Sequence, residues 1–260
     1  MSGSRPLPGQ PGPGTAANEE WASAGPSPRQ PVPVVFVPGL LCTPRLYQDQ
    51  IERLWPLGPV TIADHTRDDS VASIARRILH SAPPRFMLVG LSMGGYISFE
   101  ILRQAPERVT RLALLDTTAR PDAPEQAESR RALIALAGSG GFGEIADRLF
   151  ASLVAPQHRD DGPLRQIVRT MARDVGPEAF VRQQNAIMGR PDSRPTLEQI
   201  RCPTLVLVGE QDALTPPERA SEIAAGIRGS RLVSVAGCGH LSTLERPAEV
   251  SRALTELLQS

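Results

Sequence analysis

A serine within a short glycine-rich turn carries the clearest sign of chemistry in this sequence. Ser92 lies in Gly90–Gly94, a G-x-S-x-G pattern that follows the apolar run Phe86–Val89 and precedes the apolar stretch Tyr96–Leu102. A tight turn from a strand into a helix lifts such a hydroxyl clear of the sheet. Glycines suit this turn because its backbone segments approach too closely for side chains. We therefore expect Ser92 to be a catalytic nucleophile.

Residues late in the sequence could activate that hydroxyl. A serine needs a base to take its proton, and the base needs a third group to orient it. His240 ends a glycine-rich segment after one apolar run, and Asp212 comes shortly after another. Glu210 lies two residues before Asp212, and Asp116 follows a third apolar run. The residues alone leave these three carboxylates open as the orienting acid.

The motifs together resemble those of the α/β-hydrolase superfamily, in which the nucleophile, the acid and the histidine occur in that chain order. The resemblance rests on the segments GLSMGG, GEQDALTPP and GCGHLSTLERP, and it runs from about Val34 to the C-terminus. It implies a catalytic triad of Ser92, Asp212 and His240. Asp212 is preferred because its loop matches the family pattern, although some members carry the acid after the strand that Asp116 follows.

The resemblance also implies an oxyanion hole formed by the backbone N–H groups of Leu40 and Met93. Leu40 follows Pro38-Gly39 at the end of the apolar run Val34–Val37. The family usually has His-Gly at this point. The departure removes a histidine that often braces the loop, but it removes no donor, because the donors are main-chain groups.

Apolar runs alternate with helical patterns from Val34 onward. Strands are expected at Val34–Val37, Val60–Ala63, Phe86–Val89, Leu112–Leu115, Leu205–Val208 and Leu232–Val235. Helices are expected near Leu46–Leu54, Val71–His80, Tyr96–Gln104, Pro217–Ile227 and Glu245–Leu258. Runs so rich in Val, Leu and Ile are typical of parallel strands that are buried on both faces. The pattern predicts an α/β fold with a doubly wound, mostly parallel sheet, whose carboxyl edge gathers the candidate residues.

One long segment interrupts the alternation. Residues 120–195 contain several helical patterns and no convincing strand, which predicts a helical cap inserted into the sheet domain. The α/β-hydrolase core then comprises residues 32–119 and 196–260. Residues 1–31 are rich in Pro, Gly, Ser and Ala and are expected to be a disordered extension.

Substrate choice is expected to depend on this cap. The candidates for lining a substrate pocket are Leu41, Met171, Phe180 and Met188. Few charges share the predicted inward faces, so we expect a mostly apolar pocket that prefers neutral esters and lactones. A substrate with a carboxylate would need a buried arginine. The arginines of the cap that could serve are Arg130, Arg165, Arg169 and Arg182.

The composition excludes several other classes. The 28 basic and 28 acidic residues balance, so nothing indicates nucleic acid or an anionic membrane as a partner. Every basic residue is arginine, which excludes Schiff-base chemistry on lysine. Three cysteines without metal-ligand spacing predict no metal site, and no cofactor is implied. With no apolar leader or membrane-spanning stretch, we expect a cytoplasmic protein whose oligomeric state stays open.

The resemblance is to small bacterial ester and lactone hydrolases, including enol-lactonases. It implies a serine hydrolase that cleaves a small-molecule carboxylic ester or lactone through an acyl-enzyme intermediate. Two alternatives remain open. One is a C–C bond hydrolase that acts on ring-cleavage diketones. The other is a non-catalytic ligand-binding member of the fold.

Overall fold

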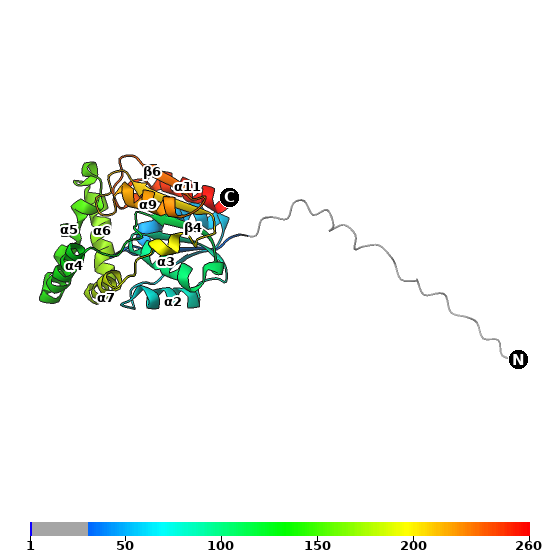
Figure 1. Cartoon of the computed structure of the whole chain (residues 1–260), viewed down its shortest axis with the longest axis horizontal. Coiled ribbons are helices and arrows are strands. Elements are labelled where there is room, and N and C mark those ends of the chain that lie inside the picture. Colours follow the sequence, from blue (N-terminus) through cyan, green and yellow to red (C-terminus); the bar gives the residue numbers. More distant parts are fainter. Residues whose placement is uncertain (2–30) are drawn as a thin grey trace. The chain divides into compact units, whose positions relative to one another are not determined.

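A six-stranded parallel sheet forms the centre of the chain (Figure 1), with the strand order β2-β1-β3-β4-β5-β6. The computed structural model describes Met1 and residues 31–260, so the expected disordered extension lies almost wholly outside the described residues. The strands are β1 (Val34–Val37), β2 (Val60–Ile62), β3 (Phe86–Leu91), β4 (Val109–Leu115), β5 (Thr204–Gly209) and β6 (Arg231–Val235). Each expected strand is present, and every paired neighbour is parallel.

Helices cover both faces of this sheet. In chain order they are α1 (Gln48–Leu54), α2 (Val71–Ser81), α3 (Met93–Gln104), α4 (Pro124–Leu136), α5 (Phe142–Leu153), α6 (Gly162–Val175), α7 (Pro177–Met188), α8 (Arg194–Leu197), α9 (Pro217–Gly226), α10 (Ser242–Glu245) and α11 (Pro247–Gln259). Shorter helical turns are η1 (Pro44–Tyr47), η2 (Trp55–Leu57), η3 (Pro106–Arg108), η4 (Ala137–Gly141) and η5 (Pro156–His158).

Two hydrophobic cores form because successive strand residues point to opposite faces of the sheet. Val34 and Phe36 pack with α1 and α11 in one core, whereas Val35 and Val37 pack with α2, α3 and α9 in the other. All four side chains are buried. The nearly continuous apolar runs in the sequence therefore reflect burial on both faces, and the doubly wound α/β fold is confirmed.

The segment between β4 and β5 is helical. Residues 120–195, all of which the structure describes, contain α4–α7 and no strand. Figure 1 shows these helices gathered at one end of the sheet. We call residues 120–195 the helical insertion. Its amphipathic helices bury residues such as Ile145, Phe150 and Phe180 in the core that α1 and α11 share. No helix among the described residues is long and apolar enough to cross a membrane.

The turn between β3 and α3 is built from backbone groups in very close contact. Ser92 has φ 54° and ψ −114°, a conformation that residues with a Cβ rarely adopt. A Cβ on Gly94 would lie 1.9 Å from the Val37 carbonyl oxygen, and one on Gly90 would lie 2.4 Å from the Gly94 carbonyl oxygen. The glycines thus let β1 approach the start of α3, which places the end of β1 beside Ser92.

Replacing Gly94 by Ala should therefore destabilise the fold. The added methyl group meets backbone rather than a movable side chain, so we expect a loss of at least about 1–3 kcal/mol in the free energy of unfolding. Gly143→Ala in α5 is the matched control, because a Cβ there meets nothing within 4 Å. That control should gain about 0.5–1 kcal/mol from helix propensity. Urea denaturation measures both, and a Gly94→Ala protein as stable as the wild type would contradict the proposed contact.

Candidate active site

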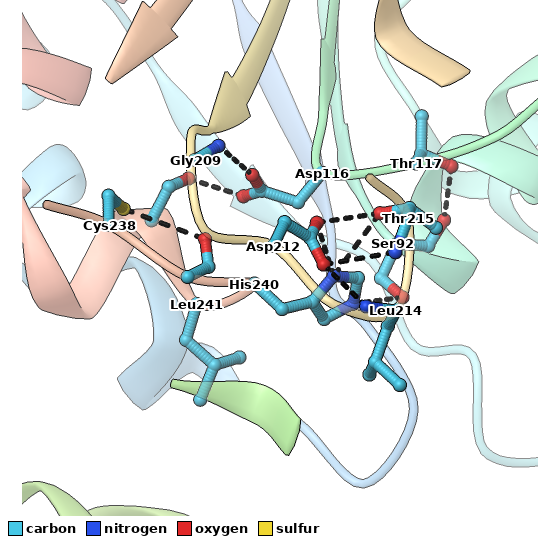
Figure 2. Close-up of polar contacts among 12 residues, drawn as sticks. Ser92, Asp116, Thr117, Gly209, Asp212, Leu214, Thr215, Cys238, His240 and Leu241 are labelled. Carbon is cyan, nitrogen blue, oxygen red and sulfur yellow. Dashed lines mark hydrogen bonds and ion pairs between the residues drawn. The ribbon is translucent and has the colours of Figure 1, made fainter. Parts of the chain in front are cut away.

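The structure brings Ser92, His240 and Asp212 together at the carboxyl edge of the sheet (Figure 2). The Oγ atom of Ser92 lies 2.9 Å from Nε2 of His240, and Nδ1 of His240 lies 2.8 Å from Oδ2 of Asp212. Ser92 follows β3, Asp212 follows β5 and His240 follows β6. Parallel strands end at the same edge, so three distant parts of the sequence meet there.

The hydrogen bonds fix where the histidine carries its proton. The ionised carboxylate of Asp212 can only accept, so Nδ1 of His240 donates to it. Nε2 of the neutral ring is then free to accept from the Ser92 hydroxyl. Asp212 is itself held by the Thr215 hydroxyl at 2.7 Å and by the backbone N–H groups of Leu214 and Thr215. The geometry is that of a nucleophile, a base and an orienting acid.

Each member of the buried pair alters the pKa of the other. Burial by itself lowers the pKa of His240, but the charge and the hydrogen bond of Asp212 outweigh it and raise that pKa above its ordinary value. Burial by itself raises the pKa of Asp212, but the charge and hydrogen bond of His240 outweigh it and lower that pKa. The pair is thus poised for the imidazole to gain a proton beside a carboxylate that stays ionised.

The two rival carboxylates occupy different places. Glu210 is exposed, and its backbone N–H pairs with Val235 on β6. Asp116 is fully buried near Asp212 and His240, and it accepts from the Gly209 N–H and from the Ser242 hydroxyl. Burial and the nearby charge of Asp212 raise the pKa of Asp116 to about 8. Neither rival hydrogen-bonds His240, so Asp212 alone of the three has the orienting position.

Two backbone N–H groups near the nucleophile have no acceptor among residues 31–260. They belong to Leu40 and Met93, the residues expected to form an oxyanion hole. Met93 is the first residue of α3, where N–H groups lack an intrahelical partner. The next amide, that of Leu41, donates instead to Oε1 of Gln183 at 3.1 Å, and Leu41 has φ 58°. This hydrogen bond ties the loop after β1 to α7 of the helical insertion.

A histidine from another loop supports the loop after β1, although this loop has Pro38-Gly39 in place of the His-Gly expected from the resemblance. His65, which follows β2, places its Nε2 2.9 Å from the Gly39 carbonyl oxygen. Burial lowers the pKa of His65, so the neutral ring donates this hydrogen bond. Sequence reasoning missed His65 because it lies outside the motifs. The parallel pairing of β1 with β2 brings the loop that carries His65 next to the loop that carries Gly39. The sequence indicated this contact only through the two expected strands.

Glu245 organises the loop that carries His240. Its side chain is fully buried and accepts from the backbone N–H groups of Gly239 and Leu241, the two neighbours of His240. It also accepts from the Ala155 N–H at 2.7 Å and contacts Nδ1 of His158 at 2.8 Å. One carboxylate therefore links the histidine loop to the helical insertion. Sequence reasoning missed this role, although Glu245 lies within the motif that contains His240.

A cavity opens beside Ser92 and His240, between the sheet edge and the helical insertion. Leu41 and Met171, both expected to line a pocket, are among its lining residues. Further apolar lining comes from both parts of the chain, namely Leu91, Leu133, Ala146, Leu149, Leu153, Val168, Ile187, Leu214 and Leu241. This part of the cavity lining is apolar, as expected from the sequence.

Phe180 and Met188 do not line this cavity, which corrects the expectation for both. Phe180 is fully buried and packs against the ring of Phe142, with ring centroids 5.8 Å apart. The lining residues that α7 contributes are Gln184 and Ile187. Met188, the last residue of α7, is absent from the lining of this cavity. The apolar spacing along α7 predicted its buried side but not which residues meet the substrate space.

The cavity also has a charged end that the sequence did not predict. Asp122, Arg130 and Arg190 line it, together with the polar residues Gln126 and Gln184. Oδ2 of Asp122 lies 2.7 Å from Nε of Arg130, and Oδ1 lies 2.8 Å from Nη1 of Arg190. The expectation that few charges face the pocket is therefore wrong.

Of the four arginines considered from the sequence, only Arg130 lines the cavity. Arg169 pairs with Asp147, Arg165 lies over the Phe150 ring, and Arg182 donates to the Thr66 carbonyl. The three cysteines are free thiols. No cluster of potential metal ligands occurs within the part of the chain that the structure describes.

Comparison with known proteins assigns the family. The model of the alpha/beta hydrolase family matches residues 7–253, nearly the whole chain. The chain therefore belongs to the alpha/beta hydrolase family. It is 28% identical to a pimeloyl-acyl-carrier-protein methyl ester esterase from Neisseria meningitidis serogroup B, and the match covers 85% of this chain and 90% of that protein.

Solved structures of hydrolases share the fold. A thermophilic esterase from Thermogutta terrifontis, determined with malate bound, is 31% identical, with a TM-score of 0.80 over 88% of this chain and 89% of the other. The enol-lactonase from Burkholderia xenovorans LB400 is 22% identical, with a TM-score of 0.79 over 88% of this chain and 92% of the other. The second likeness speaks for the fold alone.

The contact between His240 and Asp212 leads to a prediction about the pKa of His240, which can be tested without a substrate. The His240 ring should titrate above the ordinary value of 6.5, as followed by the NMR signals of its ring C–H groups across pH. Asp212→Asn removes the largest of the charges that raise this pKa and keeps the burial that lowers it, so the titration should move to lower pH than in the wild type. Glu210→Gln, at an exposed position without contact to the ring, is the control. An unchanged His240 titration in Asp212→Asn would contradict this account.

Proposed function

We propose that the chain is a carboxylic ester or lactone hydrolase that works through Ser92, His240 and Asp212. The single observation that carries the proposal is the continuous hydrogen-bond chain from the Ser92 hydroxyl to the Asp212 carboxylate. The esterases among its relatives support the same reaction class. The helical insertion acts as a cap that encloses the substrate space beside the triad.

The reaction begins with attack of the Ser92 oxygen on the carbonyl carbon of the ester. Nε2 of His240 takes the hydroxyl proton, and Asp212 stabilises the resulting imidazolium. The free N–H groups of Leu40 and Met93 then donate to the negative oxygen of the tetrahedral intermediate. His240 then returns the proton to the leaving alcohol oxygen as the C–O bond breaks, which leaves an acyl group on Ser92.

Water completes the cycle by the same steps. His240 takes a proton from the water as its oxygen attacks the acyl carbon, and the proton passes to the Ser92 oxygen as the acid product leaves. In a lactone the alcohol and the acid remain in one molecule. No cofactor takes part in these steps, because each proton and electron pair stays within the three side chains, the substrate and water.

Ser92→Ala should abolish ester hydrolysis and leave the fold intact. Loss of a triad nucleophile typically lowers turnover by about a million-fold. The rate with p-nitrophenyl acetate measures this, with Ser221→Ala on the exposed face of α9 as the control. Labelling by a fluorophosphonate, followed by mass spectrometry, should modify Ser92 in the wild type. A wild type that is neither labelled nor active would instead favour a non-catalytic member of the fold.

Replacement by Asn, which has nearly the same shape as Asp, should lower the activity far more at Asp212 than at Asp116. Asp212→Asn cannot hold the productive tautomer of His240, so we expect kcat to fall by about four orders of magnitude. Asp116→Asn should lose much less, because Asp116 has no hydrogen bond to the ring. Steady-state kinetics of the two variants, each checked for an unchanged unfolding midpoint, decide between the two acids. A larger loss in Asp116→Asn would reverse the assignment.

A further inference from the structure

The charged end of the cavity holds an excess of positive charge. A single carboxylate, that of Asp122, is shared by the guanidinium groups of Arg130 and Arg190. The side chains of Asp122 and Arg190 are only 3% and 4% exposed, and that of Arg130 is 20% exposed. Guanidinium groups stay protonated, so the ionised cluster carries one net positive charge against the cavity. Charge buried in this way favours a negative partner.

Both guanidinium groups keep N–H groups without an acceptor among residues 31–260. Arg130 has five N–H groups and makes three hydrogen bonds, two to Asp122 and one to Gln184. Arg190 donates through Nε to the Arg120 carbonyl and through Nη1 to Asp122 and the Ile187 carbonyl, while its Nη2 has no acceptor among residues 31–260. The ring of Tyr96, 4.2 Å from the guanidinium carbon of Arg190, holds the group in place. Arg190 is therefore a fixed donor whose remaining N–H groups are uncommitted.

A neighbouring glutamine adds another unused donor. Oε1 of Gln184 accepts from Nη1 of Arg130 at 2.9 Å. The oxygen must face the guanidinium, since an amide NH2 there would oppose a second donor. Nε2 of Gln184 is therefore fixed as a donor; it is buried, and it has no partner among the described residues. Because Gln184 is fully buried and lines the cavity, this orphaned donor is best satisfied by a group that enters the cavity.

We propose that Arg130, Arg190 and Gln184 form a subsite for a carboxylate of the substrate. The ester or lactone that Ser92 cleaves then carries a second, ionised acid group. This inference rests on the proposed hydrolase function, and it replaces the expectation of neutral substrates. A carboxylate only accepts hydrogen bonds and offers two oxygens, which matches a set of donors with one excess positive charge. A purely apolar chain at this end would leave the donors unpaired.

Paired substrates test the proposal. One pair compares the mono-p-nitrophenyl ester of adipic acid with p-nitrophenyl hexanoate, which has the same chain without the carboxylate. The other pair places the charge on the alcohol side and compares 6-butyryloxyhexanoate with hexyl butyrate. We expect the wild type to favour the carboxylate member of at least one pair by about 10-fold or more in kcat/KM.

Arg130→Gln is the informative variant, because Asp122 keeps Arg190 as its partner and no buried charge is left unpaired. The ratio of kcat/KM between charged and neutral members should fall by about 10- to 100-fold in this variant. Arg131→Gln is the matched control on the same helix, at an exposed position, and should keep the wild-type ratio. An absent preference in both pairs, or one that Arg130→Gln leaves unchanged, overturns the subsite.

Failure of the proposed hydrolase function would look different. In that case no ester of either pair is cleaved, and Ser92→Ala equals the wild type. Calorimetric binding of adipate then decides the subsite without turnover. One adipate per chain, weakened at least about 10-fold by Arg130→Gln and not by Arg131→Gln, supports it. No adipate binding to the wild type, or equal binding to both variants, overturns it.

Discussion

The contact of backbone on backbone between the end of β1 and the start of α3 is the constraint on which the site depends. With no side chain on Gly94, the Val37 carbonyl lies directly against the first turn of α3. That approach brings the loop after β1, which carries Leu40, close to Ser92 and Met93. It also explains why Ser92 tolerates a strained conformation, since the surrounding strands and helix leave the turn no alternative path. The proposed oxyanion hole is thus a consequence of sheet packing and needs no dedicated side chain.

The proposed triad depends in turn on buried carboxylates that have distinct tasks. Asp212 faces the imidazole, Glu245 holds the backbone on both sides of His240, and Asp116 ties the ends of β4 and β5 to Ser242. Three acids in one small volume would repel one another if all were ionised. The raised pKa of Asp116 relieves this repulsion, because the protonated form of Asp116 puts no second negative charge beside Asp212. These three buried carboxylates therefore differ in role because each has different hydrogen-bond partners.

The fold could be predicted, and the candidate catalytic residues could be located, because local signals define them. Apolar runs gave the strands, and the motifs after β3, β5 and β6 gave Ser92, Asp212 and His240. The polar end of the cavity could not be predicted in this way. Asp122 and Arg130 are only 8 residues apart, but Arg190 is distant in the chain. It meets them because α4 packs against α7, and Arg190 follows α7 directly. Helical spacing identified buried positions on α7, but it could not distinguish packing between helices from contact with a cavity.

Two adjacent glutamines on α7 couple the shape of the cavity to the position of the loop after β1. Gln183 accepts from the amide of Leu41 in the loop after β1, and Gln184 faces the cavity beside Arg130. A displacement of α7 large enough to reshape the cavity must also strain or break the hydrogen bond to Leu41. Grafting a different α7 to change selectivity would therefore alter the loop beside the nucleophile as well. The helical insertion therefore cannot be exchanged as an independent unit. A change in its sequence leaves the loop after β1 undisturbed only if the hydrogen bond between Gln183 and Leu41 is kept.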